Sequence, residues 1–435
     1  MRRTALRAAA GLLMGCQAIL AQTPAAGPTP FITLQDALQR ARTLQVGYLG
    51  AVTSSKLAHE DRVQARAALL PSLSYNNQFL YTQGNGTGFG RYIANNGVHE
   101  YVSQGNAHQT VNLGVGEFAD YRRTGAAEAL ARARQEIALR GLQVTVVNSF
   151  YGLLAAQHKQ DSVQKAFDEA NHFLDLSRKL ENGGEVAHSD VIKAQLQASD
   201  RQRDLRESQL ALETERLTLA VLLFPAFNED FALVDDLHEP TELAPFPQME
   251  ERAAKNNADV RAAVAAQNAA RHEVSVARGA HFPTLTLDYF YGIDAAQLAT
   301  RTNGLRNLGY AATATLNIPV WNWGAIQSKV KQAELQQHQA QVELSAAQRE
   351  ALAHLKAFYA EADTAHQQLE TLQASQDLAA ESLRLTTLRY QSGEATALEV
   401  VDAQNTLVQS RNSYDDGAVR YRVALANLQT LTGSF

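Results

Sequence analysis

Residues that commonly carry chemistry or rigid crosslinks are scarce in this chain of 435 residues, which has one cysteine, two tryptophans, three methionines and ten prolines. A single cysteine excludes a disulfide within the chain and any metal site built from several thiolates. The sequence has no GxxxxGK[ST] phosphate-binding loop and no GxSxG nucleophile elbow. Its net charge of −6 is opposite to the basic surface that binds nucleic acid. We therefore expect neither an enzyme nor a nucleic-acid partner.

The histidines also lack the spacing of a metal site on one helix. Two ligands on the same helix face are typically four residues apart, as in HExxH motifs. No such pair occurs among the histidines of the predicted helices, which are His158, His172, His188, His338, His354 and His366. Soft metal ions would also need more cysteine or methionine ligands. The sequence thus predicts no metal site and no cofactor.

The N-terminus is typical of an exported protein. Within residues 1–21, basic residues precede an apolar run from Ala8 to Ala21, as in a secretory signal peptide. Two cleavage sites compete, one after Ala21 and one before Cys16, where the sequence Leu-Met-Gly-Cys resembles a lipobox and would leave a lipidated cysteine. Both place the mature chain outside the cytoplasm. No later stretch is expected to have the ~20 apolar residues of a membrane-spanning helix.

The rest of the chain contains the same pattern twice. Three pairs of segments match in order, with offsets of 212, 208 and 209 residues: 65–74 with 277–286, 150–151 with 358–359, and 184–185 with 393–394. Matches at a nearly constant offset indicate a tandem duplication. We expect one repeat over residues 22–224 and a second over 248–435, joined by a proline-rich linker at 225–247.

Each repeat contains two stretches with the period-2 alternation of a β-strand, in expected hairpins at 72–117 and 284–320. After Ser72, for example, Leu73, Tyr75, Phe79 and Tyr81 alternate with polar residues. Runs of about ten residues with terminal aromatics are typical of transmembrane strands, although a half-buried soluble sheet can show the same alternation. The Gly- and Asn-rich segments 84–105 and 294–306 favour the membrane interpretation, as extracellular loops. Four strands cannot close a barrel, so several chains would have to share one, and three would supply twelve strands.

Four long helices are predicted, at 120–182, 187–224, 323–391 and 396–432. Small and apolar residues recur along them at alternating steps of four and three, the spacing of a coiled-coil seam. The seam of the last two helices includes Leu355, Phe358, Ala362, Ala365, Leu369, Val400, Ala403, Leu407, Tyr421 and Leu428. Residues 325–391 contain no proline or glycine, and at 1.5 Å per residue they would extend roughly 100 Å.

These features together resemble the TolC family of outer-membrane efflux channels over about residues 31–432. The strongest local match is the segment Tyr390–Ala403, YQSGEATALEVVDA, and the segment Gly183–Val191, GGEVAHSDV, looks like its partner in the first repeat. The resemblance implies an α+β membrane protein, in which long antiparallel coiled-coil helices form an α-helical barrel and four strands per protomer enter a shared transmembrane β-barrel. It implies a homotrimer in outer-membrane lipid, a periplasmic adaptor protein and an inner-membrane pump of the RND, ABC or MFS class.

The resemblance also assigns functional residues. Gly184 and Gly393 would reverse the helices at tips that contact the adaptor, since glycine readily takes positive φ. Three residues apart on one helix face, Glu399 and Asp402 would form carboxylate rings at the tunnel mouth; the alternative is an acidic helix start favoured by the helix dipole.

Asp190 and Tyr390 would form hydrogen bonds between neighbouring helices that keep the mouth closed. One position departs from the family pattern, because Ala395 stands where an arginine helps to lock the gate. We therefore expect a passive export duct. The alternative is a secreted trimeric coiled-coil protein with a soluble β-head.

Overall fold

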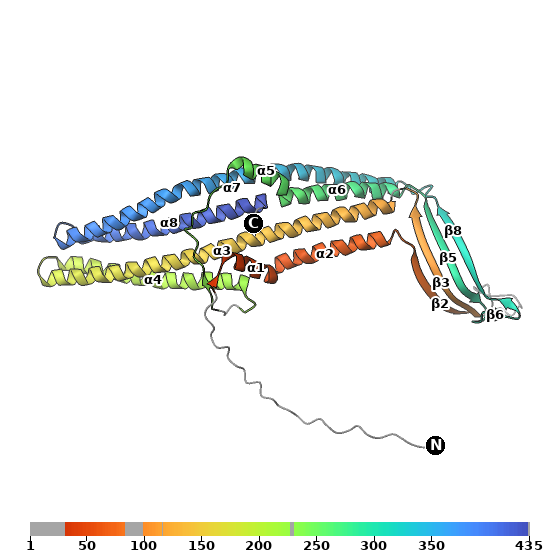
Figure 1. Cartoon of the computed structure of the whole chain (residues 1–435), viewed down its shortest axis with the longest axis horizontal. Coiled ribbons are helices and arrows are strands. Elements are labelled where there is room, and N and C mark those ends of the chain that lie inside the picture. Colours follow the sequence, from red (N-terminus) through yellow and green to blue (C-terminus); the bar gives the residue numbers. More distant parts are fainter. Residues whose placement is uncertain (1–30, 83–98, 115, 227–229, 434–435) are drawn as a thin grey trace, which may run out of the picture.

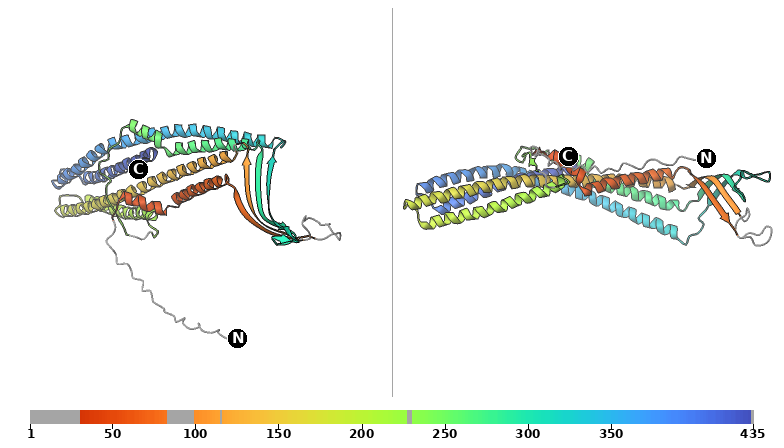
Figure 2. Two further views of the ribbon diagram at one scale, coloured as in Figure 1. Left: turned by 45° about the vertical axis from the view of Figure 1, so that its right-hand side comes forward. Right: turned by 90° about the horizontal axis from the view of Figure 1, so that it is seen from below.

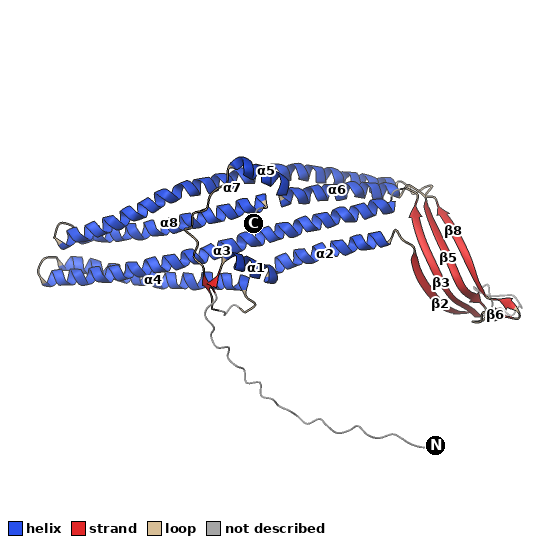
Figure 3. Cartoon of the chain, in the orientation of Figure 1, coloured by secondary structure: helices blue, strands red, loops and turns tan. Residues whose placement is uncertain are grey.

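The structure, a computed structural model, describes residues 31–82, 99–114, 116–226 and 230–433. It is an elongated molecule with one sheet at one end and two helical tips at the other (Figures 1 and 3). The predicted signal peptide at 1–21, the predicted lipidation site Cys16, and residues 84–98 of the first predicted loop lie outside the described residues.

Two long helical hairpins form most of the molecule. Helices α3 (Gly116–Asn182) and α7 (Ala325–Gln391) each contain 67 residues, which corresponds to roughly 100 Å. Each reverses into a helix of 36 residues, α4 (His188–Leu223) or α8 (Ala397–Thr432). The views in Figure 2 show the helices twisting gradually around one another.

Shorter helices complete the length of each long helix. In the first half these are α1 (Leu34–Leu44) and α2 (Val46–Ala67), and in the second α5 (Phe246–Asn256) and α6 (Ala258–Gly279). Figure 1 shows α4 and α2 following one another along α3, and α8 and α6 along α7. Local sequence fixes several helix starts, because the side chains of Thr33 and Asn257 cap the free N–H groups of α1 and α6.

The four main strands form one antiparallel sheet in the order β2-β3-β5-β8. They are β2 (Ser72–Tyr81), β3 (His99–Asn112), β5 (Thr284–Ala295) and β8 (Leu308–Asn317). A short hairpin of β6 (Arg301–Thr302) and β7 (Leu305–Arg306) lies between β5 and β8. A separate parallel pair, β1 (Phe31–Ile32) and β4 (Ala232–Leu233), joins the start of the described chain to the linker.

The register of this sheet places apolar residues on one face. Directly opposed residues of an antiparallel ladder share a face, and Tyr75, Gly105, Tyr291 and Tyr310 form one such row. Tyr75 and Tyr310 are 68% and 75% exposed in the single chain. Other members of this face are Leu73, Phe79, Tyr101, Val111, Leu285, Leu287, Tyr289 and Leu316.

The opposite face of the sheet is mostly polar. Its rows include Thr110, Thr286 and Thr315, and a neighbouring row brings His108 Nδ1 within 2.7 Å of Asp288 Oδ1. The predicted alternation is therefore present in the folded sheet, with one apolar and one polar surface.

Several predicted boundaries were wrong. Residues 99–105 were expected in a loop but form the start of β3, because they pair with both β2 and β5. The first long helix begins at Gly116 rather than at residue 120, and α5 begins at Phe246, within the expected linker. Part of the second expected loop, 294–306, forms the end of β5 and the β6–β7 hairpin.

The apolar core lies along the helix seams and is densest near the middle of the molecule. There Val146, Phe150 and Leu154 of α3 pack with Leu219 of α4 and Ile32 of β1. One stretch of α3 is apolar and long enough to meet the length and composition criteria for a membrane span, which the sequence analysis did not anticipate. A core helix can meet the same criteria, and Val146, Phe150 and Leu154 of α3 are buried. The predicted seam positions Leu355, Ala362 and Leu428 are buried, with Leu428 and Ala362 fully so.

Candidate functional site

The two helical tips have the same backbone geometry. Gly184 has φ of +76° and Gly393 has φ of +75°, in the left-handed region that favours glycine. In the first tip, the N–H of Glu185 donates to the carbonyl of Leu180 at 2.9 Å. In the second, the N–H of Glu394 donates to the carbonyl of Arg389 at 2.8 Å. Each bond spans five residues around the glycine, as in a Schellman ending that satisfies carbonyls at a helix C-terminus.

Tyr390 lies just before the second tip and connects the two helical hairpins. Its side chain is buried, and its hydroxyl lies 3.2 Å from that of Ser177 on α3. The ring also packs against Phe173, with ring centroids 5.0 Å apart. Tyr390 therefore belongs to a small apolar cluster that holds the ends of α3, α4, α7 and α8 together.

Asp190, the other predicted gate residue, has a partner of its own. Its carboxylate lies 3.3 Å from the ammonium group of Lys193, one turn further along α4. The hydrogen bonds between described residues of this chain do not join Asp190 to Tyr390. Tyr390 thus contacts α3 through Ser177, and the role of Asp190 and Tyr390 in keeping the mouth closed stays a prediction.

Glu399 and Asp402 lie in the first turns of α8, and both are exposed. Glu399 completes a capping box: its carboxylate accepts from the Thr396 N–H at 3.0 Å, while the Thr396 hydroxyl accepts from the Glu399 N–H at 3.3 Å. The Thr396 backbone bond, followed by the bond from its hydroxyl, holds the pKa of Glu399 below its usual value. The helix-start role that the sequence left open is thus real, and it leaves Glu399 charged at neutral pH.

Arg389 lies just before the second tip and contacts two residues that follow it, Glu394 and Glu399. Its guanidinium donates to the Glu394 carbonyl at 3.1 Å and lies 3.7 Å from the carboxylate of Glu399. The arginine therefore ties the end of α7 to the start of α8 across the tip.

Two exposed aromatic residues at the other end of the molecule were missed by sequence reasoning. Trp321 and Trp323 lie between β8 and α7, and they are 74% and 89% exposed. They are the only tryptophans in the chain. Their position directly after an alternating strand is visible in the sequence and could have marked them as candidate functional residues.

Comparisons with known proteins agree with this architecture. A model of the outer membrane efflux protein family matches residues 250–434. The pyoverdine export outer membrane protein OpmQ of Pseudomonas aeruginosa is 26% identical over 411 residues, covering 92% of this chain and 84% of OpmQ. The outer membrane protein TolC of Vibrio cholerae is 25% identical over 307 residues, 68% of each chain. The crystal structure of the CmeC outer membrane channel of Campylobacter jejuni superposes with a TM-score of 0.81 at 16% identity, covering 92% of this chain and 85% of CmeC.

The fold and these matches define an export channel of the outer membrane rather than an enzyme. Residues 250–434 match the outer membrane efflux protein family, and the chain is similar to TolC-like channels over most of its length. It is an outer-membrane duct for efflux or type I secretion, with a long helical portion in the periplasm.

Proposed function

We propose that three copies of this chain form the duct, with a twelve-stranded β-barrel in the outer membrane continued by a helical tunnel. The main supporting observation is that β2 and β8 are edge strands with no further partner among the described residues, beside an exposed apolar face. An open edge leaves backbone N–H and C=O groups without partners, which lipid cannot satisfy.

The edge strands are suited to pair with each other in neighbouring chains. Both contain ten residues, and the antiparallel order β2-β3-β5-β8 makes β2 and β8 run in opposite directions. The β8 strand of one chain would therefore meet the β2 strand of the next as an antiparallel pair. The apolar face would contact lipid, the polar face would line the pore, and Trp321 and Trp323 would lie at the membrane boundary.

Crosslinking between the two edges tests the trimer. Within one chain, β2 and β8 are three strand spacings apart, about 14 Å, too far for a disulfide, which needs Cα atoms within ~7 Å. We would combine Ser74→Cys on β2 with Ala311→Cys, Thr313→Cys or Thr315→Cys on β8, all on the polar face, in a Cys16→Ser background. At least one pair should give covalent trimers in isolated outer membranes, and the single variants should not. If all pairs left only monomers, while a heat-modifiable trimer band was also missing, the shared barrel would be refuted.

We further propose that the mouth of the tunnel is at the tips. Three-fold symmetry would turn Glu399 and Asp402 into two rings of carboxylates that favour cations. Their exposure in the first turns of α8 supports this role. Tyr390 would act as a latch through Ser177, and Asp190 as a second polar group close to the neighbouring helices.

The tips would also contact other components of an export system. We propose that Gly184 and Gly393 form docking points for a periplasmic adaptor, which would connect the duct to an inner-membrane pump of the RND, ABC or MFS class. The two matching, exposed glycine turns support this proposal, because a Cβ added at Gly184 or Gly393 would have no heavy atom of a neighbouring residue within 4 Å. A partner can therefore approach both turns closely.

A further inference from the structure

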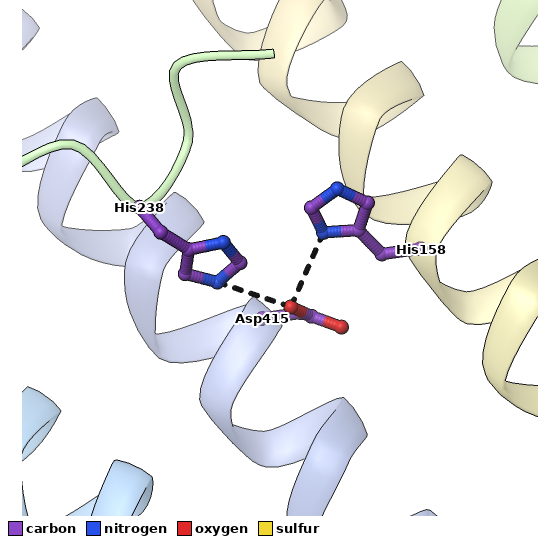
Figure 4. A group of neighbouring side chains, drawn as sticks. All are labelled: His158, His238 and Asp415. Atoms are coloured by element: carbon purple, nitrogen blue, oxygen red, sulfur yellow. Dashed lines mark hydrogen bonds and ion pairs between the residues drawn. The ribbon is translucent and has the colours of Figure 1, made fainter.

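Three segments far apart in the sequence bring two histidines and an aspartate together. His158 lies on α3, His238 lies in the linker between β4 and α5, and Asp415 lies on α8 (Figure 4). One nitrogen of each imidazole points to the same oxygen of Asp415, with His158 Nδ1 at 3.3 Å and His238 Nε2 at 3.1 Å. The spacing of histidines along single helices could not reveal this cluster.

These separations are close to those of metal ligands. With bonds of about 2.0–2.1 Å in a tetrahedral zinc site, neighbouring ligand atoms are about 3.3–3.4 Å apart. Two of the three separations already have that size, and all three atoms lie within 4.8 Å of one another. The third separation, between the two imidazole nitrogens, is therefore at most 4.8 Å.

A second carboxylate orients His158. Its Nε2 lies 2.7 Å from Asp235 Oδ2. When Nε2–H donates to this carboxylate, Nδ1 presents its lone pair to the cluster. Metal-bound histidines are typically held in this way, by a carboxylate on the nitrogen that does not bind the metal. Asp235 is therefore placed as a positioning residue rather than a ligand.

The surroundings make the cluster rigid. The His158 and His238 rings are stacked at 5.3 Å with an interplanar angle of 8°, and Tyr414 stacks on the other side of His238 at 4.6 Å. The Asp415 side chain is only 12% exposed, whereas those of His158 and His238 are 23% and 30% exposed. A water molecule or another ligand can thus reach the open side.

The alternative interpretation is that His158, His238 and Asp415 form a cluster of ion pairs that binds no metal. The hydrogen bond to Asp415, together with that to Asp235, raises the pKa of His158 to about 9 despite partial burial. Without a metal, His158 is therefore protonated at neutral pH and pairs with the two carboxylates. A proton and a metal ion compete for this nitrogen, so a direct binding measurement is needed to separate them.

We propose that His158, His238 and Asp415 bind a divalent transition-metal ion of the zinc class, with Asp235 orienting His158. Two imidazoles and one carboxylate suit Zn²⁺, Co²⁺, Ni²⁺ or Cu²⁺ and do not suit Mg²⁺ or Ca²⁺, which prefer oxygen ligands. A bound ion would connect the linker to α3 and α8 near the middle of the molecule. This proposal does not depend on the proposed gate or on adaptor docking at the tips.

Calorimetry with ZnCl₂ on the untagged, detergent-solubilised full chain tests the site. We expect one Zn²⁺ per chain and no binding heat from MgCl₂. His238→Gln should abolish this stoichiometric binding, and Asp235→Asn should weaken it about 10–100-fold while keeping one ion per chain. The matched control is His338→Gln, a change at an exposed histidine of α7, which should leave the binding constant unchanged.

Cobalt provides an independent readout of the same site. Co²⁺ should give the visible absorption of a low-coordinate ion bound to nitrogen and oxygen, and His238→Gln should remove that spectrum. Circular dichroism would verify that each variant is folded. Wild-type protein without stoichiometric Zn²⁺ binding, or equal binding by folded wild type and His238→Gln, would reduce the cluster to ion pairs and overturn the proposal.

Discussion

The hydroxyl groups of Tyr390 and Ser177 lie 3.2 Å apart in the buried space between α7 and α3. Tyr390→Phe keeps the ring that packs on Phe173 but leaves the fully buried Ser177 hydroxyl without this partner. We expect a loss of about 0.5–1.5 kcal/mol in the free energy of unfolding and a higher open probability in planar bilayers. The double variant Tyr390→Phe/Ser177→Ala should lose less free energy of unfolding than the sum of the losses in the two single variants. An unchanged open probability would show that this pair stabilises the tip without acting as a latch.

The carboxylates of α8 should control ion selectivity. Glu399→Gln combined with Asp402→Asn removes both proposed rings, and glutamine preserves the capping-box geometry at Thr396. We expect weaker cation selectivity and loss of block by a trivalent cation in single-channel recordings. Glu370→Gln, at an exposed position further along α7, serves as the control and should retain the block. Equal block in the double variant and the wild type would place the selectivity filter elsewhere.

The two faces of the sheet should differ in their tolerance of charge. Leu287 belongs to the apolar face, opposite Ala314, whereas Thr286 belongs to the polar face, opposite Thr315. In a membrane-spanning sheet, Leu287→Arg should cost about 2–4 kcal/mol near mid-membrane, because the charge meets lipid. Thr286→Arg should cost much less, because it points to the pore. The measurement is unfolding from lipid vesicles, and similar costs at both positions would contradict the assignment of the faces.

A bulky residue at the second tip should block docking of the adaptor. Gly393→Trp and Gly393→Ala both place a side chain at a φ of +75°, and both have open space around Cβ. Both variants should lose roughly 1–2 kcal/mol of stability through the strained backbone. They differ in side-chain size, and only the tryptophan is large enough to obstruct a docking partner. We expect export to fail with Gly393→Trp and to persist with Gly393→Ala, while both form outer-membrane trimers. Export that fails equally in both variants would point to the turn itself.

Acid should weaken the attachment of α2 to α3 through Glu128. This carboxylate is buried on α3 and accepts from His59 at 2.9 Å, Arg62 at 3.0 Å and also Arg132. Desolvation raises the pKa of Glu128, but the bonds to His59 and Arg62 and the charge of Arg132 outweigh it and lower the pKa below the usual value.

A carboxylate with a lowered folded-state pKa stabilises the fold above its unfolded pKa of about 4.3, and loses this contribution as pH falls through the folded value. Glu128→Gln should therefore cost about 2–3 kcal/mol at pH 7, since it removes charged hydrogen bonds. The difference from wild type should shrink below pH ~4 in denaturant titrations. If the stability difference between wild type and Glu128→Gln did not change with pH, the loss would come from packing rather than from the charge of Glu128.

Much of the helical architecture could be predicted because it depends on local patterns. The last two helices were expected at 323–391 and 396–432 and occur as Ala325–Gln391 and Ala397–Thr432. Their 3.5-residue seam and flanking glycines are visible in the sequence itself. The first half of β3 could not be predicted in this way, because residues 99–105 become a strand only through partners on both sides.

At the tips, the backbone conformation of the two glycines could be predicted from the sequence, whereas the side-chain contacts could not. Glycine at the two reversals follows from backbone sterics, and both glycines have positive φ. The pairing of Tyr390 with Ser177 joins residues 213 positions apart, and no local signal marks it. The same limit hid the convergence of His158, His238 and Asp415, whose segments meet only after the two hairpins have packed.

Because α3 is one continuous helix, a small tilt at its middle produces a large displacement at its end. From Tyr151, in the core near mid-length, to the last residue of the helix, Asn182, the arm is roughly 47 Å at 1.5 Å per residue. A tilt of about 5° around the core would carry the tip roughly 4 Å sideways, as far as a side chain is wide. Small changes in packing of the mid-length core would therefore produce larger displacements of the tip of α3. Substitutions in the mid-length core can thus alter the position of the tips without touching them.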